Sequence, residues 1–231
     1  MQALALNVSG FGNESSLHSA VKTWIAEVGD RFEVEVDGFV VDIVRGDLLI
    51  EVQTRNFSAI REKLRSLVKN HHVRLVFPIA ERKWITHING NNYRLERRRL
   101  SPKKGQLIDL FDELIRIPHL VREANFELEV LMIEEEEIRC NDGRGSWRRR
   151  GVSIKDHHLI NVVDSALFKR PEDFLRFLPF NLAQPFTSRQ LSTCLGISLR
   201  LARRMTYSLR EMGALQVVGK TGRALLFKTF V

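Results

Sequence analysis

Two acidic residues stand inside apolar stretches of the N-terminal third of the chain. Asp42 lies in FVVDIV (residues 39–44), and Glu51 lies in DLLIEVQ (residues 47–53). An ionised carboxylate in a core costs several kcal/mol unless it is paired or binds a metal. Mg²⁺ usually takes one or two carboxylates together with water and a substrate phosphate. A cation shared by these two acids would support attack of an activated water on a phosphodiester.

The flanking sequence predicts the elements that position this pair. A helix opens at residues 13–16 and ends at Gly29, with apolar residues at helical spacing (Leu17, Val21, Trp24 and Ile25). RFEVEV (31–36) alternates like a strand, and Asp37-Gly38 predicts a hairpin turn into the next strand. A second turn at residues 45–47 leads into the strand that carries Glu51. We therefore expect a helix followed by a three-stranded antiparallel meander, with both acids at one edge.

The following residues predict the rest of a mixed sheet. A second helix is expected over 58–70, an apolar strand over 73–79 and a hairpin over 84–95, around Asn89-Gly90. A strand that pairs beside the meander after a helical crossover gives an α/β sheet flanked by helices. Residues 1–98 are thus predicted to form one α/β domain.

This order of elements, with Asp42 on one strand and Glu51-Val52-Gln53 on the next, resembles the PD-(D/E)XK nuclease superfamily, which has the restriction-endonuclease-like fold. The resemblance covers about residues 10–80. It implies that Asp42, Glu51 and the Val52 carbonyl bind Mg²⁺ or Mn²⁺. Two positions depart from the family pattern: Val41 precedes Asp42 in place of Pro, and Gln53 stands where the family usually has Lys.

The departure at Gln53 leaves the water-orienting group open. Either Gln53 itself or a lysine from a neighbouring helix fills the role, with Lys63 the first candidate and Lys22 the second. Glu14, near the start of the first helix, would supply a third acid; alternatively its charge only complements the helix dipole. The competing interpretation of Asp42 and Glu51 is a solvated strand face or an inactive remnant of the site.

The charge of the chain predicts a polyanionic partner. The 231 residues carry a formal net charge of +8 with 44% hydrophobic residues, and nucleic acid is favoured over a membrane surface. A solvated basic surface without a partner is the alternative. Clustering favours nucleic acid, because the segment from Phe186 onward has eight Lys or Arg residues and one acid.

Residues 181–231 predict a winged helix-turn-helix domain. A short helix (187–196), a longer helix (198–213) and a hairpin around residues 220–222 follow one another. The basic residues expected to contact DNA lie on the second helix (Arg200, Arg203 and Arg204) and on the hairpin (Lys220 and Arg223). The alternative for such a domain is protein–protein contact.

Residues 99–180 predict a basic middle region with helices, including one or two over about 156–178, and a Gly/Arg-rich hairpin or loop. The loop GRGSWRRRG (143–151) combines phosphate donors with an aromatic ring that can stack on a base, through Arg144, Trp147, Arg148, Arg149 and Arg150. A solvated loop is the alternative. The acidic run 134–137 and the histidine pairs 71–72 and 157–158 are expected on the solvated surface.

Cysteine use and hydropathy bear on location. Cys140 and Cys194 are far apart and form no CxxC motif, which fits a reducing cytoplasm. The N-terminal residues have no secretory pattern, and no apolar run is long enough to cross a membrane. We expect a soluble cytoplasmic protein without a membrane partner.

Together these features predict a metal-dependent DNA endonuclease in repair, recombination or defence. A catalytically inactive nuclease fold that acts as a DNA-binding regulator is the alternative, and RNA processing is a third possibility. One proposed site per chain means that cutting both strands needs a homodimer or two successive events. The stretches EVQTRNFSAI and SPKKG also resemble an uncharacterised bacterial family, which adds no activity.

Overall fold

The computed structural model describes residues 15–89 and 94–230. Its first helix, α1 (Ser16–Ile25), begins where predicted, because the side chain of Ser15 accepts a hydrogen bond from the His18 N–H. Leu17 and Val21 are buried on one side of this helix. The expected N-terminal helix is confirmed.

The predicted meander is confirmed with tight turns at both ends of its middle strand. Strands β1 (Arg31–Val36), β2 (Phe39–Arg45) and β3 (Leu48–Val52) pair antiparallel in sequence order. Asp37 and Gly38 both have positive φ angles, 50° and 79°, as a two-residue hairpin turn requires. The turn therefore fixes the register in which Val36 lies opposite Phe39.

After the meander, α2 (Arg61–Leu67) crosses to β4 (His72–Ile88), which runs parallel to β3. The expected strand 73–79 and the first arm of the hairpin are one continuous strand of 17 residues. The polar residues 81–83 interrupt the apolar pattern, but the strand continues through a bulge between Ala80 and Arg82. Its far half pairs antiparallel with β5 (Leu95–Leu100).

The sheet extends beyond the expected domain boundary at residue 98. Strand β6 (Phe126–Asn141) pairs parallel with β4, and β7 (Val152–Phe168) pairs antiparallel with β6. The resulting order in the seven-stranded sheet is β1-β2-β3-β4-β6-β7, with β5 on β4. The prediction of a helix over 156–178 is wrong for β7, because pairing with β6 along its length holds this segment extended; only a 3-10 turn follows at Pro171–Phe177.

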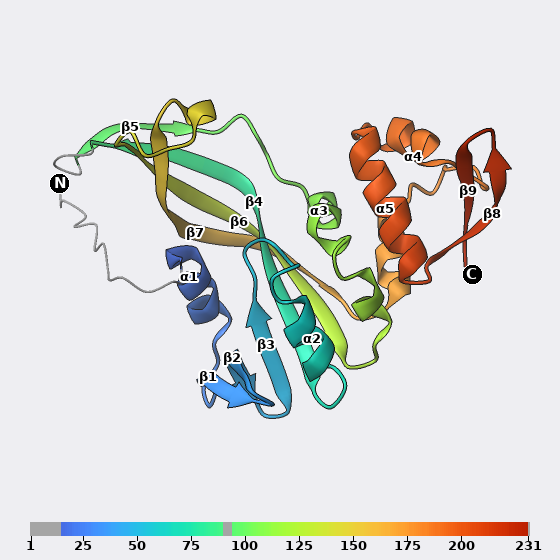
Figure 1. The fold of residues 1–231 in the computed structure, drawn as a ribbon, viewed down its shortest axis with the longest axis horizontal. Coiled ribbons are helices and arrows are strands. Elements are labelled where there is room, and N and C mark those ends of the chain that lie inside the picture. The colour runs from blue at the N-terminus through green and yellow to red at the C-terminus, as the bar shows by residue number, and fades with distance from the viewer. Residues whose placement is uncertain (1–14, 90–93, 231) are drawn as a thin grey trace.

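Helices cover both faces of this mixed sheet, as predicted (Figure 1). On one face, α1 packs Leu17 and Val21 against Ile43, Ile50 and Val76. On the other face lie α2 and the segment between β5 and β6, which contains 3-10 turns at Leu107–Leu110 and Pro118–Arg122 around the short helix α3 (Phe111–Leu114). Among the helices in the described ranges, none is long and apolar enough to cross a membrane.

The C-terminal segment contains two helices followed by a two-stranded hairpin: α4 (Ser188–Leu195), α5 (Leu199–Glu211), β8 (Leu215–Thr221) and β9 (Ala224–Thr229). Thr187 and Gln190 form a capping box at the start of α4, and Gly196 ends it with a positive φ of 65°. The element order expected for residues 181–231 is confirmed.

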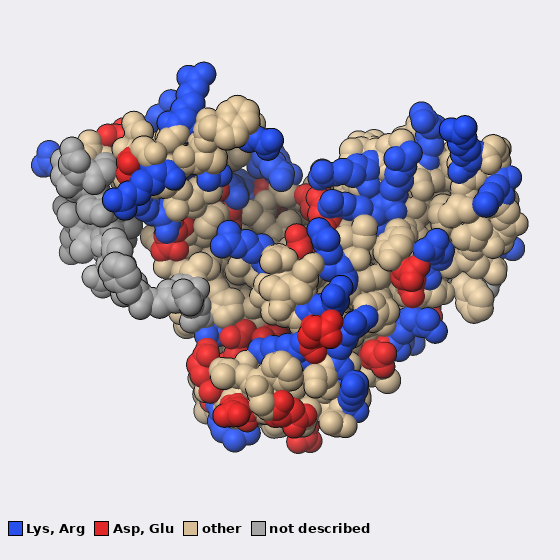
Figure 2. Space-filling view, viewed as in Figure 1, with Lys and Arg blue, Asp and Glu red and all other residues tan. Residues whose placement is uncertain are grey.

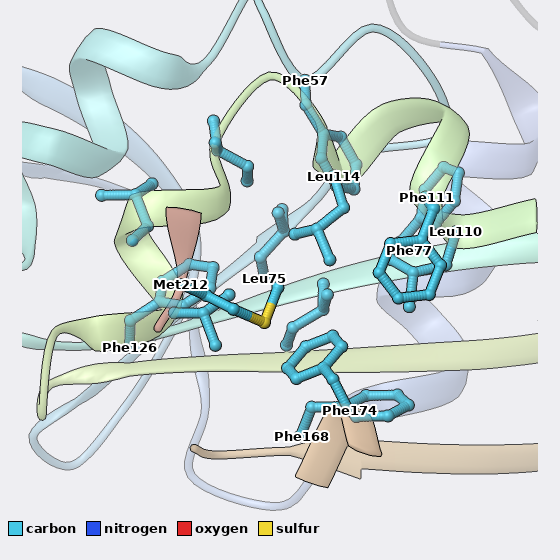
Figure 3. Packing of buried hydrophobic residues seen from close by; sticks show 14 of the residues in the cluster. Phe57, Leu75, Phe77, Leu110, Phe111, Leu114, Phe126, Phe168, Phe174 and Met212 are labelled. Carbon is cyan, nitrogen blue, oxygen red and sulfur yellow. The ribbon is translucent and has the colours of Figure 1, made fainter. Parts of the chain in front are cut away.

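An aromatic and aliphatic core joins the C-terminal segment to the sheet (Figure 3). Phe174 stacks on Phe168 at the end of β7, with ring centroids 4.5 Å apart, and meets Phe111 of α3 edge-on at 6.3 Å. Met212, at the end of α5, lies in the same cluster. The three expected segments therefore share one core instead of each burying its own.

Truncation of Phe174 tests this shared core. The side chain is fully buried, so Phe174→Ala is expected to lower the free energy of unfolding by about 3–5 kcal/mol. Phe180→Ala is the matched control, because Phe180 is exposed and its loss should change stability by less than about 0.5 kcal/mol. Urea unfolding followed by circular dichroism measures both; equal stability of the two variants would contradict the packing described.

Candidate functional site

The Asp42 carboxylate lies where the strand ladders on both sides of β2 are interrupted. The β1–β2 register passes from Ile43 to Val41, and the β2–β3 register begins at Ile43. Glu33, the β1 residue skipped by the register, has a positive φ of 51°. Oδ2 of Asp42 instead accepts a hydrogen bond from the Val52 N–H at 2.8 Å. The carboxylate is therefore held against the end of β3.

Glu51 lies beside Asp42, and its carboxylate is paired with a residue of α2. Its side chain is buried, and Oε1 is 2.5 Å from Nζ of Lys63 on α2. Lys63 also donates to the Val40 carbonyl at 2.5 Å. The backbone N–H of Asp42 points at the same Glu51 oxygen, at 3.4 Å. Lys63 thus links the ends of β2 and β3 to α2.

Two side chains of α1 approach the pair from the other face of the sheet. Nε2 of His18 is 2.8 Å from the Val52 carbonyl oxygen and 3.3 Å from Oδ2 of Asp42. Nζ of Lys22, one helical turn later, is 3.9 Å from Oδ1 of Asp42 and forms an ion pair with Glu33. Three nitrogen-bearing side chains therefore compensate the two acids.

The surroundings give the two carboxyls different acidities. Burial raises the pKa of Asp42, but the hydrogen bonds from His18 and Val52 and the nearby positive charges outweigh burial, so the pKa is lowered overall. Burial and the charge of Asp42 raise the pKa of Glu51 to about 7, against the opposing effect of Lys63. Asp42 is thus ionised over a wide pH range, whereas Glu51 titrates near neutrality.

The structure brings together most of the residues predicted for this site. Asp42, Glu51, the Val52 carbonyl and Lys63 lie at one end of the meander, and Lys22 adjoins them. The Gln53 amide instead donates to the carbonyls of the following loop, at Arg55 and, at 3.3 Å, at Asn56. Glu14 lies outside the described residues.

His18 is a member of this site that the sequence analysis missed. Its position beside the apolar stripe of α1 gave no signal by itself. The available signal was its spacing from Lys22, since residues i and i+4 share a helix face. Two polar residues on a helix face that packs against a sheet indicate a polar feature beneath it.

A second polar cluster lies further along the sheet. Glu135 and Glu137 on β6 are each 5% exposed, so the expectation of a fully solvated acidic run is wrong. Their oxygens and a ring nitrogen of His157 lie within 4.8 Å of one another. Among the described residues, this is the group of three potential metal-ligating side chains that lie this close together. Burial raises the pKa of each carboxyl, but hydrogen bonds and nearby positive charges together outweigh burial, so both pKa values are lowered overall. The hydrogen bonds come from His157 and Lys83 at Glu135 and from Arg139 at Glu137.

A cavity of about 500 Å³ adjoins the second cluster. It is lined by Leu17 of α1, next to His18, and by Thr54 and Arg55 of the loop that follows β3. The residues of the second cluster line another part of its wall. The cavity is therefore open to Glu135, Glu137 and His157, and Asp42 and Glu51 are not among its lining residues.

Basic side chains gather on two parts of the surface, on either side of a notch in the molecular outline (Figure 2). One part is the hairpin between β6 and β7, where Trp147 is 83% exposed. The predicted arginines of this hairpin (Arg144, Arg148, Arg149 and Arg150) are exposed as well. The other part is the C-terminal segment.

On α5 the arginines are divided between two faces. Arg200 and Arg203 are exposed, as are Lys220 and Arg223 on the hairpin. Arg204 instead forms an ion pair with Asp112 of α3 and donates to its carbonyl at 3.2 Å, so its expected place on the exposed face is wrong. A groove of about 510 Å³ runs between α5 and β9, with basic and aromatic lining from Arg189, Arg203, Tyr207, Arg210 and Arg223.

Comparisons with other proteins establish the family of this chain. Residues 15–169, from α1 to the end of β7, match the family described as Domain of unknown function (DUF8091), and the chain belongs to this family. It is also similar to an uncharacterized protein of Treponema pallidum (strain Nichols), with 30% identity over 217 residues, 93% of this chain and 85% of that protein. No solved structure matches the chain.

The acidity of Glu51 predicts how stability depends on pH. The folded chain holds a proton on Glu51 up to about pH 7, whereas an unperturbed Glu loses it near 4.5. The free energy of unfolding should therefore fall between these pH values as ionisation is forced on the buried group, by on the order of 3 kcal/mol. Glu51→Gln keeps the group neutral and should be more stable relative to wild type at pH 8 than at pH 5.

Urea unfolding of both proteins in EDTA at the two pH values measures this difference. Asp47→Asn, at an exposed residue of the adjoining turn, is the control and should show little pH-dependent difference from wild type. A Glu51→Gln difference that is the same at pH 5 and pH 8 would show that the buried Glu51 carboxyl has an ordinary pKa.

Proposed function

We propose that this protein is a metal-dependent DNA endonuclease with a PD-(D/E)XK-like site. The observation that carries the proposal is the meeting of Asp42, the Val52 carbonyl, Glu51 and Lys63 at the end of β3. The order of elements also supports it: a helix, an antiparallel meander, a helix, and a strand parallel to the third strand of the meander.

The oxygen atoms at this site fit a divalent cation. The Val52 carbonyl and Oδ2 of Asp42 both lie close to one atom, Nε2 of His18, so the two oxygens converge on a common point. Adjacent ligands around Mg²⁺ at about 2.1 Å lie about 3 Å apart, so the His18 contacts of 2.8 and 3.3 Å have the spacing of neighbouring ligands if Nε2 joins the two oxygens. Asp42, Val52 and Glu51 would hold Mg²⁺ or Mn²⁺ after His18 turns aside or joins the ligands. The ion would supply Lewis-acid stabilisation of the phosphate and acidify a water.

Lys63 is the best candidate for the role that the family usually gives to the lysine of the motif. Its ammonium reaches Glu51 from α2, and the amide of Gln53 is engaged by its own loop. Once Glu51 turns to a cation, the ammonium of Lys63 is released beside the site. There it can orient a water and stabilise the negative charge that develops on a phosphate.

DNA would contact the basic surfaces on both sides of the notch (Figure 2). We assign the C-terminal segment as a winged helix, with Arg200 and Arg203 of α5 toward the DNA and with Lys220 and Arg223 on the wing. The exposed hairpin would add phosphate contacts from its arginines and stacking from Trp147. One site per chain means that cutting both strands requires a homodimer or two successive cuts.

A DNA-binding regulator on an inactive nuclease fold is the second candidate. One observation favours it: His18, Lys22 and Lys63 of the chain itself contact the carboxylates of Asp42 and Glu51. Both candidates bind DNA, and cleavage separates them.

Cleavage is expected to depend on both acids and on a metal. Purified protein with a panel of labelled DNAs (duplex, nicked, branched, single-stranded and base-damaged) should cut at least one in Mg²⁺ or Mn²⁺ and none in EDTA. Asp42→Asn, Glu51→Gln and Lys63→Met should each lower the rate by about 10²-fold or more, because each removes a ligand or a charge stabiliser. Asp47→Asn should cut like wild type. Cleavage that survives Asp42→Asn would exclude this site.

DNA binding should depend on the exposed face of α5. Arg203→Ala is expected to weaken binding at low salt and to reduce the dependence of log K on log salt by about 1, as for one lost phosphate contact. Lys69→Ala is the charge-matched control, since Lys69 is exposed at the end of the segment that follows α2. Fluorescence anisotropy at several salt concentrations measures both; equal slopes for the two variants would place the DNA elsewhere.

A further inference from the structure

We infer that Glu135, Glu137 and His157 form a second divalent-metal site, separate from the acid pair at Asp42 and Glu51. The inference does not rest on the proposed nuclease activity. It rests on the donor set, on the sheet positions that hold it, and on the cation that now lies between its carboxylates.

The sheet fixes the three donors relative to one another. Glu135 and Glu137 are two residues apart on β6, so their side chains share a face of the sheet. His157 on β7 lies directly opposite Glu137 in the register. The ligand atoms lie within 4.8 Å of one another, and ligand atoms about 2.1 Å from a tetrahedral Zn²⁺ ion lie about 3.4 Å apart. Small side-chain rotations are enough to bring the three donors onto one ion.

An ammonium group lies among these donors in the described structure. Lys83, opposite Glu135 on β4, places Nζ 2.6 Å from Oε1 of Glu135 and 3.4 Å from Oε2 of Glu137. The side chain of Lys83 is 29% exposed, whereas those of the two acids are 6% exposed. Lys83 therefore has more room to move than the two acids, and a divalent ion can take its place.

The remaining contacts orient the donors without blocking them. Arg139 donates from Nε to Oε1 of Glu137 at 2.5 Å, which leaves Oε2 directed toward Lys83. Such a bond to the second oxygen of a ligating carboxylate is the usual means of fixing its orientation. Nδ1 of His157 lies 3.5 Å from Oε1 of Glu135, beside the same space.

The donor types and the cavity define the class of ion. One imidazole with two carboxylates suits Zn²⁺, Mn²⁺ or Fe²⁺ better than Mg²⁺, which prefers oxygen ligands alone. Lys83, both acids and His157 line the cavity of about 500 Å³. Three protein ligands beside an open space leave positions for water, so the site is exchangeable and not a closed structural site.

Zn²⁺ titration of the full-length chain with the Asp42→Asn substitution tests this inference, because that change removes the other candidate site. Calorimetry should give one Zn²⁺ per chain. Adding His157→Ala should weaken binding at least tenfold, and His158→Ala should not, because His158 pairs with Asp156 instead. Adding Lys83→Met should tighten binding about tenfold, because the competing ammonium is gone.

Co²⁺ absorption gives a readout that does not depend on affinity alone, since its d–d bands report nitrogen and oxygen ligands. The bands should appear in the Asp42→Asn chain and be lost with His157→Ala or, if that variant fails to fold, with Glu137→Gln. Absence of Zn²⁺ binding in the Asp42→Asn chain would overturn the inference. So would binding that His157→Ala and His158→Ala leave equally strong. Loss of DNA cleavage in Asp42→Asn alone bears only on the proposed nuclease site.

Discussion

Charge compensation of buried carboxylates is the constraint on which the rest of this structure depends. A sheet covered on both faces cannot hold an ionised acid without a partner, because the desolvation penalty of a buried charge exceeds the free energy gained from packing. This sheet holds two sets of such acids: buried Glu51 with the partly buried Asp42 at the end of the meander, and buried Glu135 and Glu137 on β6. In each set the partners come from different elements: α1 and α2 at Asp42 and Glu51, and β4 and β7 at Glu135 and Glu137. These ion pairs therefore hold the layers of the fold in register as well as forming candidate sites.

Local sequence signals were sufficient for the first helix and the meander that follows it. Turn residues with positive φ, strict alternation in β1 and apolar runs in β2 and β3 predict the meander, since each of these signals acts within a few residues. The C-terminal order of helices and hairpin was predicted for the same reason, through its caps at Thr187 and Gly196. Asp42 and Glu51 were found because a charge inside an apolar run is visible in the sequence, and Lys63 was found because the family resemblance implies a lysine that Gln53 does not supply.

Features that depend on long-range pairing were not predicted. The polar residues at 81–83 and along β7 mask the strand pattern in the sequence. These segments are extended because β4, β6 and β7 pair along their lengths. That same pairing buries Glu135 and Glu137 and places His157 opposite them, 20 residues away in sequence from Glu137. Arg204 was misplaced because its partner, Asp112, belongs to a segment whose position the sequence did not fix. The spacing of His18 from Lys22 was a weak signal, and the contact of His18 with Asp42 depends on the packing of α1 over the sheet.

The central claim is that Asp42, Glu51 and the Val52 carbonyl bind a divalent ion. Anomalous diffraction at the manganese edge from crystals soaked in Mn²⁺ tests it most directly. The account predicts an anomalous peak between Oδ2 of Asp42 and the Val52 carbonyl, with Glu51 turned toward it and Lys63 released from Glu51. A map without a peak there, in which His18 still bridges Asp42 and Val52 while Lys63 still pairs with Glu51, would contradict it.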